Sequence, residues 1–506
     1  MKRRDLVRGA VLTGATLAGA VRAPWVWTRD RRVERRSDWD LIVLGAGTAG
    51  MPAAIFAAQA GARVLVIEAT SVIGGTLDRS TGQVAASGTV WQRAKGIVDT
   101  PDAHYLDHMR LNDGSSDPGI TRRFVDEAPA MLNWLATQGF SVSDGDPVKG
   151  RGHDPFTVAR YQNGPEHGRS ILKAMTPAFE AAVASGLLTL KLETQAVELI
   201  ENSKSEIVGV VTQTLDGERA EFFGRRVLLA TGGCAANPVM FQTLHGTALT
   251  VAARPSSQGH GILLAQSVGG FVRGGDQYVP LYGTLLDSDL LPSGQSGFFR
   301  HDPSARPPWE IHVNANGERF VREDHPSHQH RQLALARQPG HALWVVGDRE
   351  TLANSPSFIS RWGQDTLVKA FADAHPMFTR ATTLKALAVR AGIDPLGLQR
   401  HVDRYNQSLR RGDDDEFGRL FRPREIVSAP FFAVRMTGWT VFSFAGVAVD
   451  DELRVLRRDG SIIPNLLAAG EVIGGGATSG KAYTNGAMVT PALAFGRYLG
   501  RRASEK

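Results

Sequence analysis

The chain of 506 residues is 42% apolar, 21% charged and 8% aromatic, a composition that indicates a folded globular protein and excludes a disordered or fibrous one. A single cysteine, Cys234, excludes an intramolecular disulfide framework, a Cys-based zinc site and an iron–sulfur cluster. The formal net charge of +6 resides in residues 1–36, and the rest of the chain is close to neutral. Nothing therefore indicates nucleic-acid binding, and no apolar run is long enough to predict a membrane span.

The first residues resemble an export signal. Arg3-Arg4 precedes a small-residue apolar stretch, Gly9–Ala20, which is typical of the twin-arginine route. Residues 24–39 have the charged, patternless composition of a linker. We therefore expect residues 1–36 to be a twin-arginine signal and linker, and the protein to be periplasmic or extracellular. The alternative is a disordered basic tail.

A nucleotide-binding pattern follows the linker. The apolar run Asp40–Leu44 predicts a buried parallel strand, and it leads into the G-x-G-x-x-G sequence of residues 45–50. Residues 51–60 are Ala-rich and predict a helix, and a second strand over residues 63–67 ends at Glu68. The glycines allow a pyrophosphate to approach a helix N-terminus, and the acid is placed to accept from a ribose hydroxyl.

Further small-residue turns follow in a specific order. Gly74-Gly75-Thr76 and Ser80-Thr81-Gly82 come first, a strand over residues 226–230 then leads into Thr231-Gly232-Gly233, and Asn465–Glu471 precedes a helix predicted over residues 490–501. Together with the pattern above, these segments resemble the FAD-binding elements of the fumarate reductase/succinate dehydrogenase flavoprotein superfamily, which includes the 3-ketosteroid dehydrogenases.

The resemblance implies an α/β fold, in which a split Rossmann-type FAD-binding domain carries an inserted α+β capping domain. The implied FAD-binding domain covers residues 37–272 and 438–506, and the capping domain covers residues 273–437. Within the insert, residues 283–330 are loop-like in composition and residues 365–410 are helical in pattern. The residues implied to hold FAD are Gly45, Ala46, Gly47, Ala49, Gly50, Glu68, Ala69, Gly75, Thr76, Thr81, Gly82, Val197, Thr231, Gly232, Glu471, Met488 and Val489.

Fumarate reductases of this superfamily bind a dicarboxylate with two histidines and two arginines in recognisable sequence contexts. In this chain those positions fall on Tyr282, Ser327, Phe442 and Tyr483. Loss of both guanidinium groups removes bidentate carboxylate recognition, so an aromatic pocket for a neutral, ring-shaped carbonyl compound is expected. If the alignment slips, Arg322 or Lys481 restores a positive charge.

The ketosteroid dehydrogenases carry a tyrosine at the same C-terminal position. The resemblance implies that the Tyr483 hydroxyl and the Gly486 amide bind the ketone oxygen, although Tyr483-Thr-Asn-Gly departs from the Tyr-Pro-Gly-Pro-Gly of that family. Such hydrogen bonds stabilise the enolate that forms when an α-proton leaves. We expect Tyr282, or otherwise Tyr278, to be the base, with help from a neighbouring group because a phenol ionises near pH 10.

These residues predict an FAD-dependent dehydrogenase that introduces a C=C bond beside the carbonyl of a neutral cyclic ketone, a 3-oxosteroid or a smaller ring. One alternative is an FAD-dependent ene-reductase acting on an activated alkene, and another is an electron-carrying flavoprotein or flavin-binding protein without a substrate of its own. The expected partners are a small-molecule ketone and an external electron acceptor, which is oxygen, a quinone or a redox carrier.

Five other residues have a simple structural interpretation as well as a functional one. His325, His328 and His330 resemble a metal cluster but lack an acidic ligand pattern, so a solvated loop and no metal are expected. Cys234 is expected to pack beside the cofactor rather than to form a covalent link with it. Tyr161 lies in a Gly/Pro/His-rich stretch and is a weaker candidate for the substrate pocket.

Overall fold

The computed structural model describes residues 38–247, 253–288, 293–300, 302–413 and 415–505. The predicted export signal and linker, residues 1–36, lie outside these residues. Residues Ser37–Lys506 form one compact unit. No helix within the described ranges is both long and apolar enough to cross a membrane.

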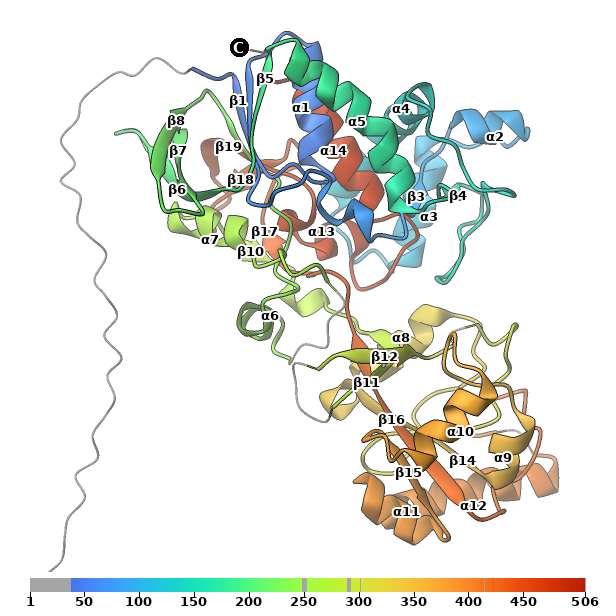
Figure 1. Ribbon diagram of the computed structural model, residues 1–506. Coiled ribbons are helices and arrows are strands. Elements are labelled where there is room, and N and C mark those ends of the chain that lie inside the picture. The colour runs from blue at the N-terminus through green and yellow to red at the C-terminus, as the bar shows by residue number, and fades with distance from the viewer. Residues whose placement is uncertain (1–37, 248–252, 289–292, 301, 414, 506) are drawn as a thin grey trace, which may run out of the picture. The chain divides into compact units, whose positions relative to one another are not determined.

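A parallel sheet forms the first half of the fold (Figure 1). Its central strands are buried, because helices cover one face and the antiparallel sheet formed by residues 194–223 covers the other. The order is β18-β19-β9-β1-β2-β5, and only β18 is antiparallel to its neighbour. The strands are β1 (Leu41–Leu44), β2 (Val64–Ile67), β5 (Leu188–Lys191), β9 (Val227–Leu229), β18 (Arg454–Leu456) and β19 (Ile462–Ala468).

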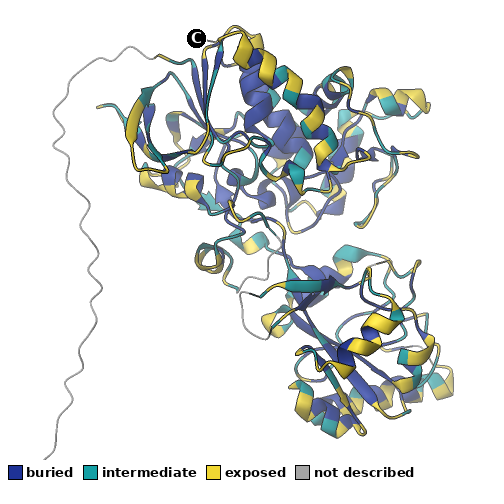
Figure 2. Ribbon diagram, viewed as in Figure 1, coloured by how far each residue is buried: buried dark blue, intermediate teal, exposed yellow. Residues whose placement is uncertain are grey.

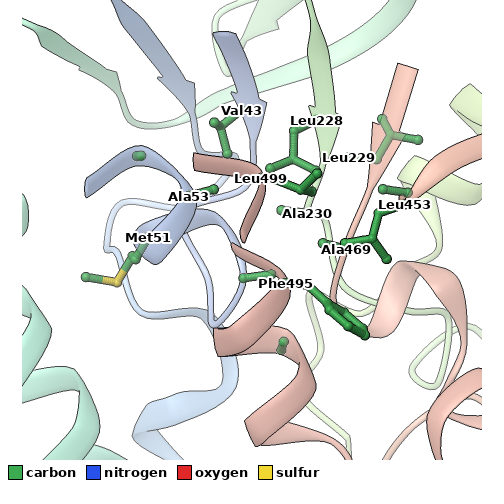
Figure 3. Packing of buried hydrophobic residues seen from close by; sticks show 14 of the residues in the cluster. Val43, Met51, Ala53, Leu228, Leu229, Ala230, Leu453, Ala469, Phe495 and Leu499 are labelled. Carbon is green, nitrogen blue, oxygen red and sulfur yellow. The ribbon is translucent and has the colours of Figure 1, made fainter. Parts of the chain in front are cut away.

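Two helices from opposite ends of the sequence pack together against this sheet. They are α1 (Gly50–Gln59) and α14 (Val489–Arg501), and Figure 3 shows buried side chains of both helices and of β9 in one cluster. The approach is close because α14 carries Gly496 and Gly500 on the contacting face. A Cβ atom at these positions would overlap the carbonyl oxygens of Ala49 and Ala53.

Other elements complete this half. A separate antiparallel sheet has the order β6-β7-β8, and β3 pairs with β4. The strands are β3 (Val84–Ala85), β4 (Tyr161–Gln162), β6 (Thr194–Glu201), β7 (Ile207–Thr214) and β8 (Arg219–Phe223). The helices are α2 (Val90–Ala94), α3 (Pro101–Leu111), α4 (Pro118–Thr137), α5 (Gly168–Ala184), α6 (Pro238–His245), α7 (His260–Ser267) and α13 (Gly475–Ser479).

The second main sheet is antiparallel, and we call it the cap sheet. Its order is β12-β11-β16-β14-β13, with β15 also paired to β16. Buried side chains line both of its faces, and Figure 2 shows buried central strands beside helices with exposed outer faces. Its strands are β11 (Leu281–Leu286), β12 (Gln295–Phe298), β13 (Ile311–Val313), β14 (Ala342–Asp348), β15 (Phe378–Ala381) and β16 (Phe431–Trp439).

The helices beside the cap sheet are α8 (His328–Ala336), α9 (Arg349–Asn354), α10 (Gln364–Ala372), α11 (Leu384–Ala391) and α12 (Pro395–Arg411). The last three match the helical pattern of residues 365–410 in the sequence, and α8 and α9 precede that range. Residues 283–330 differ from the loop-like expectation, because β12 and β13 lie within them. These strands are only 4 and 3 residues long, too short for an alternating pattern to stand out among glycines and prolines.

A short two-stranded sheet lies where the chain passes between the FAD-binding half and the cap sheet. Strand β10 (Val272–Arg273) is antiparallel to β17 (Gly446–Val447). The predicted domain boundary at residue 273 falls on β10, whereas the predicted boundary at residue 437 falls within β16, before β17. The segments that connect the halves therefore run side by side, which places residues 274–281 and 439–445 in the same region.

We predict that Gly496→Ala destabilises the fold, because its methyl group overlaps a backbone carbonyl of α1. Overpacking costs about 1–3 kcal/mol, whereas helix propensity returns only about 1 kcal/mol. The net loss should lower the thermal unfolding midpoint by roughly a few degrees. Gly119→Ala in α4 is the matched control, because its nearest neighbour is the Asp451 Cβ atom at 3.3 Å. Equal midpoints for the two variants would contradict the prediction.

Candidate functional site

The turn between β1 and α1 contains three glycines with different roles. Gly45 has a φ of 103°, and a Cβ atom there would lie 2.5 Å from the Ala230 carbonyl oxygen. A Cβ atom at Gly50 would overlap the Gly45 carbonyl oxygen. Both glycines are thus required by the fold itself. At Gly47, in contrast, the nearest protein atom is the Gly75 Cα at 3.5 Å, so the protein packing alone would tolerate a methyl group.

The N-terminus of α1 is suited to an anion. The Ala49 N-cap makes no side-chain hydrogen bond, and the first turn contains no acidic residue. Amide groups at a helix N-terminus attract phosphate, and an absent side chain at Gly47 allows its close approach. These features fit the pyrophosphate of FAD, and bound flavin would supply hydride acceptance at this edge of the sheet.

Glu68 connects the end of β2 to the glycine turn. Its Oε2 accepts a hydrogen bond from the Ala46 amide at 2.8 Å, and its Oε1 accepts from the Thr70 amide at 2.9 Å. A carboxylate held at this place can accept from a ribose hydroxyl. Ala69 follows Glu68 in the chain.

The segment Gly75–Asp78 forms a short 3-10 helix against the glycine turn. A Cβ atom at Gly75 would lie 2.8 Å from the Gly47 Cα, so these two backbones are close. The Arg254 guanidinium donates to the Gly75 carbonyl oxygen and, at 2.6 Å, to Asp78. Arg254 is a positive group beside the predicted phosphate position that no motif in the sequence indicated.

The remaining predicted FAD residues come from several separate segments. The Thr231 Oγ1 is buried and has no hydrogen-bond partner among the described residues, which fits a donor or acceptor for a ligand. Glu471 Oε1 accepts from the Ser443 amide at 3.0 Å, and burial raises the pKa of Glu471 to about 7. Gly232 follows Thr231. The structure places Thr76 beside Gly75, Thr81 and Gly82 before α5, Val197 on β6, and Met488 and Val489 at the start of α14.

A second group of residues forms an aromatic cluster. Its buried members are Leu281, Phe442, Phe444 and Tyr483, and its partly buried members are Tyr278, Trp439 and Met488. The ring centroid of Tyr483 lies 5.3 Å from that of Phe442 and 5.6 Å from that of Phe444. Three distant segments of sequence therefore meet in one apolar environment.

The two phenols of this cluster are neutral hydrogen-bond donors. Burial raises the pKa of Tyr483 well above its usual value, and burial also raises the pKa of Tyr278. The Tyr483 hydroxyl lies 3.4 Å from the Thr440 Oγ1. Since neither phenol ionises near neutral pH, both can donate to a carbonyl oxygen.

The structure separates Tyr282 from this cluster. Its ring is buried in the core of the cap sheet beside Phe299, and its hydroxyl lies 2.7 Å from the His312 Nδ1. Its neighbour Leu281 belongs to the aromatic cluster instead. Adjacent residues of a strand point to opposite faces, so Leu281 faces the aromatic cluster while Tyr282, one position later in β11, faces the core of the cap sheet. Burial also raises the pKa of Tyr282 well above its usual value, which is unfavourable for a base.

The other positions from the fumarate reductase pattern are distributed as follows. Phe442 is in the aromatic cluster, whereas Ser327 is the N-cap of α8. Arg322 forms an ion pair with Asp324 at 2.8 Å, and Lys481 is exposed. Neither residue belongs to the aromatic cluster, so neither supplies it with the positive charge that the reductase arginines would provide.

The structure places three further candidate residues, Gly486, Tyr161 and Cys234, in packed surroundings. Gly486 has a φ of 78°, and a Cβ atom there would lie 2.6 Å from the Ala85 amide nitrogen. Tyr161 is buried with Ala85 in a different cluster. Cys234 is buried, and its amide donates to Ser443 Oγ at 3.1 Å.

The three histidines expected on a solvated loop are placed differently, because His325 precedes α8 whereas His328 and His330 lie in the first turn of this helix. The rings of His325 and His330 stack with centroids 3.9 Å apart. Within the part of the chain that the structure describes, no group of three His, Cys, Asp or Glu residues is arranged to hold a metal ion.

The sequence reasoning missed His153. Its ring lies almost parallel to that of Tyr483, with centroids 5.8 Å apart and an angle of 13° between the planes. Its Nδ1 is buried and has no partner among the described residues. The only local signal was a histidine between glycine and aspartate in Arg151-Gly-His-Asp154.

We predict that Gly47→Ala leaves the apoprotein folded but weakens FAD binding about tenfold or more, because the added methyl group meets the pyrophosphate rather than the protein. Flavin content after purification and the unfolding midpoint of the apoprotein measure the two effects separately. Gly50→Ala is the contrasting variant and should lower the midpoint itself. An unchanged flavin affinity of Gly47→Ala would contradict the assignment.

Comparisons with known proteins agree with this geometry. A fumarate reductase (cytochrome) of Shewanella frigidimarina is 26% identical over 477 residues, covering 92% of this chain and 77% of that protein. A 4-oxocyclohexanecarboxylate 2-dehydrogenase of Sinomonas cyclohexanicum is 26% identical over 551 residues, covering 92% of this chain and 93% of that protein. The structure of 3-ketosteroid delta1-dehydrogenase from Sterolibacterium denitrificans has the same fold, with a TM-score of 0.72 at 20% identity, covering 92% of this chain and 100% of that one.

The family model described as FAD binding domain matches residues 40–484. This range contains the glycine turn, Glu68, Thr231 and Glu471, and the predicted α/β fold with FAD as cofactor is confirmed. The chain belongs to this FAD-binding family and is an FAD-dependent oxidoreductase that acts on CH–CH groups.

Proposed function

We propose that the protein is a dehydrogenase that introduces a C=C bond beside the carbonyl of a neutral cyclic ketone. The observation that supports this proposal is the aromatic cluster around Tyr483, which offers apolar walls and two neutral phenols, with Tyr483 at one of the two positions where the reductase pattern has an arginine. Burying a dicarboxylate there would leave its charges unpaired, whereas a cyclic ketone loses little on burial.

The roles of the residues follow from their protonation. The Tyr483 hydroxyl donates to the ketone oxygen, with the Gly486 amide as the second donor. Tyr278 supplies a further neutral phenol beside Phe444, whose ring centroid lies 5.7 Å from that of Tyr278. These donors stabilise the negative charge that develops on the oxygen when the α-proton leaves.

The phenols of the aromatic cluster have raised pKa values and stay neutral, so they can donate to a carbonyl oxygen in either direction of the reaction. The proposed direction, oxidation of the ketone, is supported by a relative. One relative is named for dehydrogenation of a cyclic ketone and another for fumarate reduction, so the name of the first agrees with this assignment.

The reaction must deliver its electrons to an external acceptor, and we propose oxygen, a quinone or a separate redox carrier. We further propose export by the twin-arginine route, on the basis of Arg3-Arg4 in the sequence. Replacing both arginines with lysine should abolish export of the chain from a bacterial host, measured by fractionation. Unchanged export would contradict this assignment.

Tyr483→Phe should slow flavin reduction by a cyclic ketone about 10²- to 10³-fold, because the variant loses a donor to the developing oxyanion. Anaerobic loss of flavin absorbance would be followed with 5α-androstane-3,17-dione, substituted cyclohexanones and succinate. Tyr161→Phe is the matched control, because Tyr161 is also buried but lies in a different cluster. Flavin reduction by succinate alone, or an unaffected Tyr483→Phe variant, would refute the proposed function.

A further inference from the structure

The loop of residues 150–154 brings a histidine to the aromatic cluster. The His153 ring is parallel to that of Tyr483 with centroids 5.8 Å apart, and its buried Nδ1 has no hydrogen-bond partner among the described residues. A buried ring nitrogen normally has a partner, because leaving it unpaired costs about 1–3 kcal/mol. The unpaired Nδ1 therefore indicates that a bound molecule supplies its contact.

Asn485 fixes this loop relative to Tyr483. Its Nδ2 donates to the Asp154 carbonyl oxygen at 3.3 Å, and its Oδ1 accepts from the Arg151 amide at 3.3 Å. A Cβ atom at Gly150 would lie 2.7 Å from the Asn485 Nδ2, so the loop approaches closely only because residue 150 is glycine. Asn485 is 1% exposed, and its side chain spans the loop on both sides of His153.

Asp154 ties the same loop to the helix that follows the cap sheet strand β13. Its carboxylate accepts from the Ser327 hydroxyl and, at 2.8 Å, from the His328 amide at the N-terminus of α8. Carboxylates are stabilising at this end of a helix. His153 is therefore held from two directions, by Asn485 on the Tyr483 segment and by Asp154 on α8.

The charges around His153 keep its imidazole neutral. Burial lowers the pKa of His153 to about 4, with a further lowering from His328 and an opposing effect of Asp154. The phenol of Tyr483 contributes no charge near neutral pH. A neutral imidazole has one ring nitrogen with a free lone pair, which is the form that accepts a proton.

We propose that His153 is the base that removes the α-proton of the ketone. This inference rests on the proposed function. The α-carbon–hydrogen bond breaks, the proton moves to the Nδ1 of His153, and the electron pair forms the enolate whose oxygen is held by Tyr483. Bound FAD would accept the β-hydrogen with its electron pair, which would balance the two electrons removed from the ketone.

His153 and Tyr483 are neighbours, as the reaction requires of a base and a donor that serve one ketone. The ketone oxygen and the α-carbon are separated by one carbon atom, and the hydrogen bond to the oxygen and the contact from the base to the α-proton each require about 3 Å. Tyr282 does not meet this requirement, because it lies in the core of the cap sheet.

The test is exchange of α-hydrogen for deuterium, which needs the base but no hydride transfer. Holoenzyme with chemically reduced FAD is incubated anaerobically in D₂O with 5α-androstane-3,17-dione or 4-methylcyclohexanone, and incorporation is followed by NMR. We expect His153→Gln to slow exchange about 100-fold or more. His330→Gln is the matched control, because His330 is an exposed histidine on α8 outside the aromatic cluster.

The pH profile distinguishes His153 from a tyrosine base. With His153 the exchange rate is level above about pH 5 and falls about tenfold per pH unit below its pKa of about 4. With a phenolate base the rate would instead rise steadily toward pH 10. Added imidazole should restore part of the exchange in His153→Ala, which a purely structural role would not allow.

Asn485→Ala tests the positioning of the loop. We expect slower exchange of about tenfold with an unchanged pH midpoint, because the base remains but its place is less well defined. Flavin content and the unfolding midpoint of each variant show that the fold is retained.

The outcomes separate the two proposals. If the wild-type protein exchanges none of the ketones, the proposed function fails. If the wild-type protein exchanges and His153→Gln does so at the same rate, or if the rate rises toward pH 10 without a plateau, the proposed function stands and His153 is not the base.

Discussion

The close approach of backbone atoms at the β1–α1 turn underlies the architecture of this protein. Gly45 lies against the end of β9, Gly50 lies against Gly45, and Gly496 and Gly500 of α14 lie against α1. These contacts bring the first and last helices of the described chain together at the carboxyl edge of one sheet. Gly47 is left with free space at that edge, which is where a dinucleotide needs to approach.

The aromatic cluster arises from the way the chain enters and leaves the cap sheet. The outgoing segment contributes Tyr278 and Leu281, the returning segment contributes Trp439, Phe442 and Phe444, and the Tyr483 segment completes the cluster. Alternation along β11 then decides that Leu281 faces this cluster while Tyr282 enters the core of the cap sheet. One position of register thus separates a residue of the aromatic cluster from a residue of the core of the cap sheet.

The departure from the ketosteroid dehydrogenase sequence at Thr484-Asn485 has a structural counterpart. Asn485 bonds to both sides of His153, and Asp154 caps α8. Ser327, which stands at the position of a reductase arginine, therefore takes part in a polar contact between α8 and the loop of residues 150–154. We infer that loss of the cationic groups was accompanied by a different source of base, contributed by a loop before β4.

The sequence by itself determined the nucleotide-binding half, because the strand, the glycines and the acid are close together in the chain and each has a local physical reason. It also predicts that the guanidinium groups of the reductase pattern are replaced, a prediction that depends on the residues at the matched positions. Only the tertiary structure decided that Tyr282 is buried beside His312 and that His153 lies against Tyr483. The first depends on strand register and the second on contacts between residues more than 300 positions apart, and neither leaves a periodic signal in the sequence.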